Sequence, residues 1–177
     1  MTDLSHPAIQ RIVEVAARKG IALEIQMVPG EDGDTDLGQM VKSVVFVAPR
    51  PGDELATIVC LISGRDRVDP GSVAAVAGEV SVRPATARET SALTGYAIGA
   101  VPSFGHGRDV RIVMDQELCS NQWVWAAAGT REARFRIAPR TLRMLANAVV
   151  APLAHESWTH EAEQMTQRLA LDAGANA

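Results

Sequence analysis

Cysteine is scarce in this sequence, with two residues among 177. Cys60 and Cys119 lie far apart and neither belongs to a C-x-x-C pair, so we expect no disulfide framework. Long apolar runs are also missing, since none approaches the roughly 18 residues that a membrane span needs. The first residues, MTDLSHPAIQR, lack the basic start and apolar core of a secretory signal. These absences predict a reduced, cytoplasmic protein with no membrane partner.

Basic charge is too low for broad binding of duplex nucleic acid, which needs a basic surface. The formal net charge is −4 and the calculated pI is about 5.6. The arginines are unevenly placed, however, and residues 131–143 hold Arg131, Arg134, Arg136, Arg140 and Arg143. This cluster fits a solvated helix and strand face, which is the commoner arrangement, or a small phosphate site.

The apolar content of 47% predicts a folded protein, and 177 residues suit one domain over 1–177. Residues 6–20 have the apolar spacing of an amphipathic helix, with Ser5 as the expected N-cap and Gly20 as the stop. No internal repeat or linker is visible in the sequence.

Helices and strands alternate along the rest of the chain. Capping residues and apolar spacing predict helices over residues 70–77, 86–95, 139–150 and 155–173. Apolar segments bounded by turn residues predict strands over residues 21–28, 37–48, 55–63, 110–115, 123–128 and 133–138. The order indicates the α+β class, with a mixed, largely antiparallel sheet.

Lys42 is one of only two lysines, the other being Lys19, and it stands at the start of an apolar strand. In a strand it shares one face with Val44 and Phe46, while Val45 lies on the other face. Both faces are apolar, which favours an interior strand. A lysine at the end of such a strand commonly extends its ammonium into solvent, and otherwise directs it at a ligand.

The segment 94–106, TGYAIGAVPSFGH, is rich in glycine and contains a proline. Such a segment exposes backbone N–H groups that can hold an anion or a developing oxyanion. A plain surface turn would have a similar composition. The segment indicates a binding site only if Lys42 converges on it.

Four segments in order carry a family resemblance: KSVVFVA from Lys42, TGYAIGAVPSFGH from Thr94, VMDQELC from Val113, and VWAAAGTREARFRIAP from Val124. Over about residues 21–149 the chain resembles the YbaK/EbsC family. These are free-standing aminoacyl-tRNA deacylases related to the editing domain of bacterial prolyl-tRNA synthetase. Two departures are visible: relatives commonly have proline at the position of Ser103, and a longer helix before the lysine strand.

The resemblance implies a mixed sheet curled into a partly closed barrel with flanking helices. It also implies hydrolysis of the ester that joins a wrong, small amino acid to the terminal adenosine of a tRNA, with the proline-specific tRNA as the expected one. Lys42 would lie in the pocket, and backbone amides would grip the ester along the loop of Gly99, Ala100, Val101, Pro102 and Ser103. Water would attack with help from substrate groups, without a protein nucleophile, metal or cofactor.

Further residues are expected to border the substrate or the tRNA. The candidates for substrate contact are Thr94, Tyr96, Phe104, His106, Asp115 and Gly129. Asp115 could instead cap the short helix that follows, and His106 could cap the loop. The candidates for acceptor-stem phosphates are Arg131, Arg134 and Arg140.

Two other kinds of site, a serine-hydrolase triad and a metal site, have weaker support from the sequence. Ser103, His106 and Asp109 invite a serine-hydrolase interpretation, but no G-x-S-x-G elbow is present and residues so close in one loop rarely form a triad. His155 and His160 have no further ligands at metal-binding spacing, so we expect no metal site.

The tryptophans and cysteines are expected to be structural. Trp123 and Trp125 share one strand face, which favours core packing over a base-stacking surface. Cys60 is expected in the core and Cys119 beneath the sheet.

Three functions stay open from the sequence: an editing enzyme, a binding module for the tRNA acceptor end or an aminoacyl-nucleotide, and a hydrolase of another small acyl ester. The acidic net charge fits recognition of the tRNA end alone, presented by an aminoacyl-tRNA synthetase or an elongation factor. The helix expected at 155–173 would cover the core or support a homodimer, and a monomer is equally compatible.

Overall fold

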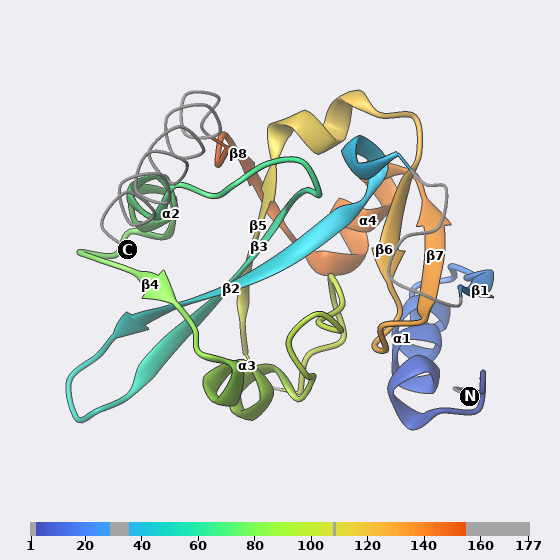
Figure 1. Cartoon of the computed structure of the whole chain (residues 1–177), viewed down its shortest axis with the longest axis horizontal. Helices are drawn as coiled ribbons and strands as arrows, with labels where there is room; N and C mark the ends of the chain where they lie inside the picture. The colour runs from blue at the N-terminus through green and yellow to red at the C-terminus, as the bar shows by residue number, and fades with distance from the viewer. Residues whose placement is uncertain (1–2, 29–35, 108, 155–177) are drawn as a thin grey trace, which may run out of the picture.

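The computed structural model describes residues 3–28, 36–107 and 109–154, and its strands form two sheets (Figure 1). The larger sheet has the order β4–β2–β3–β5–β8 and the smaller sheet the order β1–β7–β6. The strands are β1 Ile25–Met27, β2 Val41–Pro49, β3 Leu55–Ser63, β4 Arg83–Pro84, β5 Arg111–Asp115, β6 Val124–Ala127, β7 Ala133–Ile137 and β8 Val149–Ala151. The helices are α1 Pro7–Arg18, α2 Pro70–Ala77, α3 Ala87–Thr94 and α4 Pro139–Ala146, with the 3-10 turns η1 Leu37–Gln39 and η2 Gln116–Ser120.

The predicted α+β class with a mixed sheet is confirmed. The pairs β2–β3, β2–β4, β1–β7 and β6–β7 are antiparallel, whereas β3–β5 and β5–β8 are parallel. A bridge between Met40 and Trp125 links the two sheets where β2 begins. No closed barrel is formed by the residues described, so the partly closed barrel implied by the resemblance is not confirmed.

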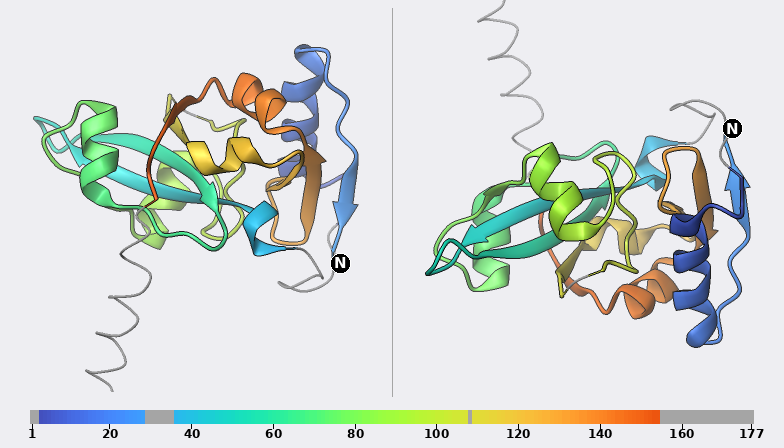
Figure 2. Two further views of the ribbon diagram at one scale, coloured as in Figure 1. Left: turned by 90° about the horizontal axis from the view of Figure 1, so that it is seen from above. Right: turned by 90° about the horizontal axis from the view of Figure 1, so that it is seen from below.

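The long β2–β3 hairpin crosses the middle of the molecule, and β6, β7 and α1 lie together beyond one of its ends (Figures 1 and 2). Strand β3 is buried on both faces, as its continuous apolar sequence requires. Val59 and Leu61 enter the larger core with α1 and α4, whereas Ile58 and Cys60 enter a second core beneath α2. The strand predicted for 55–63 is therefore confirmed, and so is the buried position of Cys60.

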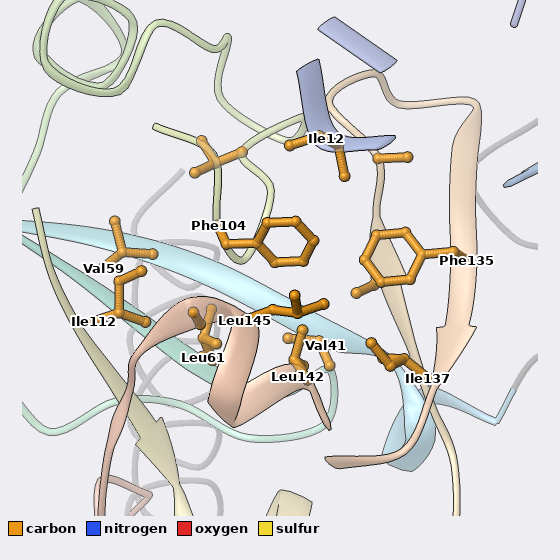
Figure 3. Close-up of a cluster of buried hydrophobic side chains, with 14 of the residues drawn as sticks. Ile12, Val41, Val59, Leu61, Phe104, Ile112, Phe135, Ile137, Leu142 and Leu145 are labelled. Atoms are coloured by element: carbon orange, nitrogen blue, oxygen red, sulfur yellow. The ribbon is translucent and has the colours of Figure 1, made fainter. Parts of the chain in front are cut away.

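The larger core joins elements from the whole chain (Figure 3). Phe104 and Phe135 lie at its centre with ring centroids 5.9 Å apart. Ile12 of α1 and Leu142 of α4 complete it from the two sides. Because Phe104 belongs to the glycine-rich segment and Phe135 to β7, this packing holds that segment against the smaller sheet.

Helix ends follow the expected chemistry with two exceptions. The capping box of Thr86 and Glu89 is present at the start of α3. The N-cap of α1 is His6 rather than Ser5, and its imidazole Nδ1 accepts the Ala8 N–H at 3.2 Å. Helix α4 ends at Ala146 rather than near 150, because Asn147 takes a left-handed conformation (φ 48°) and β8 follows.

The helix expected at 155–173 lies outside the described residues. Among the helices that are described, none combines the length and apolar character needed to cross a membrane.

Candidate active site

A cavity of about 340 Å³ opens where the beginning of β2 faces the β6–β7 hairpin. Lys42 lines it from β2, and Gly99 and Val101 line it from the glycine-rich bend. The remaining wall includes Met40, Ser43, Gly64, Thr130, Arg131, Glu132 and Arg134. The chain thus brings Lys42 and the bend to one cavity, which is the juxtaposition that the sequence interpretation requires.

Lys42 stands opposite Ile62 in the β2–β3 ladder, and its side chain is exposed at the cavity wall. The ammonium Nζ donates a hydrogen bond to the backbone carbonyl of Asp66 at 2.7 Å. Partial burial lowers the pKa of Lys42, the carboxylate of Asp66 opposes this shift, and the nearby charge of Arg67 adds to it. The hydrogen bond to Asp66 holds the ammonium in a defined position at the site.

The bend itself is a tight turn in which the Ala100 N–H donates to the Ala97 carbonyl at 2.9 Å. Gly99 has φ +82°, a conformation that glycine adopts without steric cost. Arg131 packs against this turn and donates to the Ile98 carbonyl at 3.1 Å. The N–H groups of Gly99 and Val101 have no acceptor among the described residues, and both residues line the cavity.

Four of the predicted substrate-contact residues support this bend and do not line the cavity. The Tyr96 hydroxyl donates to the Gly105 carbonyl at 3.0 Å, and His106 Nε2 donates to the Pro102 carbonyl at 2.9 Å. Thr94 is buried and its hydroxyl closes the end of α3 through the Thr90 carbonyl at 2.6 Å. Phe104, the fourth, is in the core. We therefore leave these residues out of the proposed site.

Gly129, also absent from the cavity wall, owes its identity to a close approach. It has φ +93°, and a Cβ at this position would lie 3.0 Å from both the Cβ and the carbonyl oxygen of Ala8. Glycine at 129 thus lets the β6–β7 hairpin pack against α1.

Asp115 is buried and lies outside the cavity wall. Its carboxylate accepts the N–H of Leu153 at 2.7 Å, that of Ala154 at 3.3 Å and that of Glu117 at 3.2 Å. It caps η2 and fixes the chain after β8. This is the capping alternative, and the predicted water-binding position in the pocket is not what the structure favours.

Asp115→Ala is accordingly expected to lower the free energy of unfolding and to leave the activity per folded molecule unchanged. Removing the carboxylate leaves the buried N–H of Leu153 without its acceptor, at a cost of about 2–3 kcal/mol in the free energy of unfolding. Denaturant unfolding measures this loss, with the exposed Asp109→Ala as the matched control. A loss of activity per folded molecule without a loss of stability would instead indicate that Asp115 contacts the substrate.

Two of the three predicted phosphate ligands reach the site. Arg131 and Arg134 line the cavity, whereas Arg140 is exposed on α4 away from it. The Nε of Arg134 and the hydroxyl of Thr130 are buried in the cavity wall without hydrogen-bond partners among the described residues. Buried polar groups are rarely left unpaired, so this wall is suited to a ligand that supplies acceptors.

The rival sites find no support in the described part of the chain. The Ser103 hydroxyl is buried without a partner, and the Nε2 of His106 is occupied by a carbonyl, so no serine–histidine pair exists. No cluster of metal-binding side chains occurs among the described residues. His155 and His160 lie outside them.

Two structural predictions were wrong. Cys119 is exposed on η2 rather than packed beneath the sheet. Trp123 is 42% exposed, and Trp125 is half-buried on the outer face of the smaller sheet rather than in the core. Both tryptophans are covered by arginines, a pairing that alternation along β6 and β7 could have indicated.

Sequence reasoning also missed most of the other lining residues, and Gly64 and Thr130 show why. Gly64 lies in the turn after β3, and the register of the β2–β3 hairpin, which pairs Val41 with Ser63, brings this turn to the cavity. Thr130 follows the AAG motif directly and lines the cavity with a buried hydroxyl that has no partner among the described residues.

The fold and site define an α+β protein whose cavity combines a fixed ammonium, two arginines and unpaired backbone N–H groups. Such a cavity suits a substrate with anionic or carbonyl oxygens. The family pattern described as "Aminoacyl-tRNA editing domain" matches residues 6–145, and the chain belongs to this family. The family resemblance predicted from the four segments is thereby confirmed.

Individual relatives agree with this assignment. A proline–tRNA ligase of Limosilactobacillus fermentum is 32% identical over 83 residues, which are 47% of this chain and 14% of the ligase. The match thus spans only a small part of that enzyme. A solved structure described as a candidate trans-editing enzyme for prolyl tRNA synthetase is 33% identical, with a TM-score of 0.74 over 84% of this chain and 98% of the other.

A second solved structure, from computational grafting of epitopes on scaffold proteins, is 30% identical with a TM-score of 0.74. It is covered over 97% of its length, and 84% of this chain is matched. The fold described above is therefore shared along nearly the full length of these solved relatives.

Proposed function

We propose that this protein hydrolyses the ester bond of a mischarged aminoacyl-tRNA, acting in trans on tRNA that a synthetase has released. The observation that carries the proposal is that Lys42, Gly99 and Val101 line the same cavity. An ester needs a positioned water and stabilisation of the developing oxyanion, and this cavity offers groups for the second task.

In the proposed reaction water attacks the ester carbonyl and a tetrahedral oxyanion forms. The N–H groups of Gly99 and Val101 are the proposed oxyanion donors, since both lie at the cavity and have no acceptor in the described structure. In well-studied enzymes the removal of one such donor costs about 3–4 kcal/mol. The bond between the acyl carbon and the ribose oxygen then breaks, the proton given up by the attacking water passes to that oxygen, and the amino acid leaves with the hydroxyl of the water in its carboxyl group.

Lys42 is proposed to place a compact positive charge beside the ester carbonyl or the adjacent nucleotide. Its hydrogen bond to the Asp66 carbonyl fixes the ammonium and leaves two N–H donors for substrate. With no serine–histidine pair in the described structure, we propose that water is activated by the hydroxyl or thiol of the substrate itself.

The proline-specific tRNA carrying a small wrong amino acid is the proposed substrate. Both informative relatives are connected with prolyl-tRNA synthetase by their descriptions. The acidic net charge supports recognition of the acceptor end alone, with Arg131 and Arg134 as candidates for its phosphates. A synthetase or an elongation factor would then present the rest of the tRNA.

A panel of charged tRNAs tests the proposal. Proline-specific tRNA carrying alanine, cysteine, serine or threonine is incubated with the protein, and release of the amino acid is followed against spontaneous hydrolysis. Faster release of at least one of the four is the expected result, with correctly charged prolyl-tRNA as the control that stays intact.

Other outcomes separate the alternatives. Binding of charged tRNA without release would favour the non-catalytic binding module. Indifference to every charged tRNA, together with cleavage of small acyl esters, would favour the other hydrolase.

A further inference from the structure

The face of the β6–β7 hairpin that points away from the core carries two tryptophan–arginine pairs. Side chains alternate along these antiparallel strands. The core side is formed by Val124, Ala126, Phe135 and Ile137. The opposite face, here called the Trp–Arg face, is formed by Trp123, Trp125, Arg134 and Arg136.

Each arginine lies over a tryptophan ring. The guanidinium carbon of Arg136 is 5.2 Å from the ring centroid of Trp123, and that of Arg134 is 4.8 Å from the ring centroid of Trp125. No carboxylate forms a salt bridge with Arg134 or Arg136 in the described part of the chain. Stacking on a ring leaves the N–H edge of a guanidinium free for oxygen acceptors.

The Trp–Arg face is continuous with the cavity. Arg134 belongs to both, and its ladder partner Ala127, two residues beyond Trp125 on β6, also lines the cavity. The bridge from Trp125 to Met40 brings the same strand to the beginning of β2, beside Lys42. A polymer whose last unit occupies the cavity could therefore extend over Trp125 to the exposed ring of Trp123.

The chemistry of this face suits single-stranded RNA. Unpaired bases stack on aromatic rings and guanidinium planes, and phosphates accept hydrogen bonds from arginine. The two tryptophan rings offer surfaces on which bases can stack. Arg134 and Arg136, which form no salt bridge among the described residues, can bind phosphates. The chain as a whole is acidic, so the positive charge of Arg131, Arg134 and Arg136 is a local feature of this hairpin.

We infer that the Trp–Arg face binds the unpaired nucleotides that precede the aminoacylated adenosine of the tRNA. This inference rests on the proposed function, because it takes the cavity as the place of the terminal ester. Trp123 and Arg136 would act as binding residues remote from the ester, outside the catalytic machinery.

The test uses a fluorescein-labelled, uncharged single-stranded RNA that ends in CCA, so that binding is measured without hydrolysis. Trp123→Ala is expected to raise Kd by at least about fivefold, as for the loss of one stacked base. Trp123→Phe keeps an aromatic ring and should retain most of the affinity. Because Trp123 is already 42% exposed, these changes should leave folding intact.

Arg136→Lys separates stacking from charge, since lysine keeps the charge and loses the planar contact. It is expected to weaken binding severalfold. Arg50 supplies the control, because it follows the far end of β2 and pairs there with Glu79. The matched exchange there is Arg50→Lys, which also keeps the charge and loses the planar group, and neither Arg50→Ala nor Arg50→Lys should change Kd.

The outcomes distinguish this inference from the proposed function. An unchanged Kd in Trp123→Ala and Arg136→Lys, with deacylation intact, overturns the Trp–Arg face and leaves the editing function standing. Weaker RNA binding in both variants, in a protein that deacylates no tRNA, supports the face and overturns the editing function. For an active enzyme the expected signature is a raised KM with kcat unchanged.

Discussion

Lys42→Ala is expected to lower enzyme-catalysed deacylation at least about a hundredfold while the protein keeps its fold. Lys42 supplies the only lysine ammonium in the cavity wall, and its side chain is exposed with one hydrogen bond, to the Asp66 carbonyl. Loss of an exposed side chain with one such contact changes the free energy of unfolding by about 1 kcal/mol or less. Single-turnover kinetics on a mischarged tRNA and thermal unfolding measure the two quantities.

The other lysine provides a matched control. Lys19 Nζ also donates to a backbone carbonyl, that of Met144 at 3.3 Å, and Lys19 does not line the cavity. Lys19→Ala should therefore retain full activity. Equal activity in Lys42→Ala and Lys19→Ala would remove Lys42 from the mechanism, whatever the substrate is.

The pKa of Lys42 adds a second signature to the same prediction. Partial burial lowers this pKa below its ordinary value of 10.5. If the charged form is the active one, the enzyme-catalysed rate, after subtraction of spontaneous hydrolysis, falls as the pH rises through that lowered pKa. Lys42→Arg keeps its charge over the same range, so any activity it retains should not show this fall.

The elements that the sequence predicted well are those whose signals are local. Strand β3 was predicted over its observed range because a continuous apolar run between turns fits only a buried strand or helix. Helix α3 carries its own capping box and a glycine stop. No contact with a distant part of the chain is needed to recognise either element.

The elements that were missed depend on partners far away in the chain. Strand β4 has two residues and is defined by its pairing with β2. Strand β8 follows α4 and is defined by its parallel pairing with β5. Its apolar residues continued the helical pattern of α4, and only the left-handed Asn147 marks the break.

The candidate site shows the same division. Lys42 and the bend could be proposed from the sequence because the family resemblance supplied their relation in space. The hydrogen bonds that occupy Tyr96 and His106 could not be foreseen, since a pocket residue and a residue that braces the pocket look alike in sequence. The same holds for Trp125, whose apolar ring is covered by Arg134 instead of the core.

Gly99→Ala is expected to reduce deacylation roughly tenfold to a hundredfold with a modest loss of stability. A Cβ at this position would lie 3.3 Å from the Nε of Arg131, so the new methyl group presses on the side chain that packs against the bend. The left-handed backbone (φ +82°) adds strain of about 1–2 kcal/mol. Both effects displace the N–H groups proposed to bind the oxyanion, and rate measurements at saturating substrate detect this displacement.

Gly52→Ala is the control that shows whether backbone strain alone reduces deacylation. Gly52 has nearly the same backbone conformation (φ +78°), but nothing lies within 4 Å of a Cβ there, and it sits in the turn between β2 and β3. It should lose the same stability as Gly99→Ala or less and keep full activity. If both variants kept full activity, the bend could not be the oxyanion site, because misplacing a preorganised donor slows the reaction.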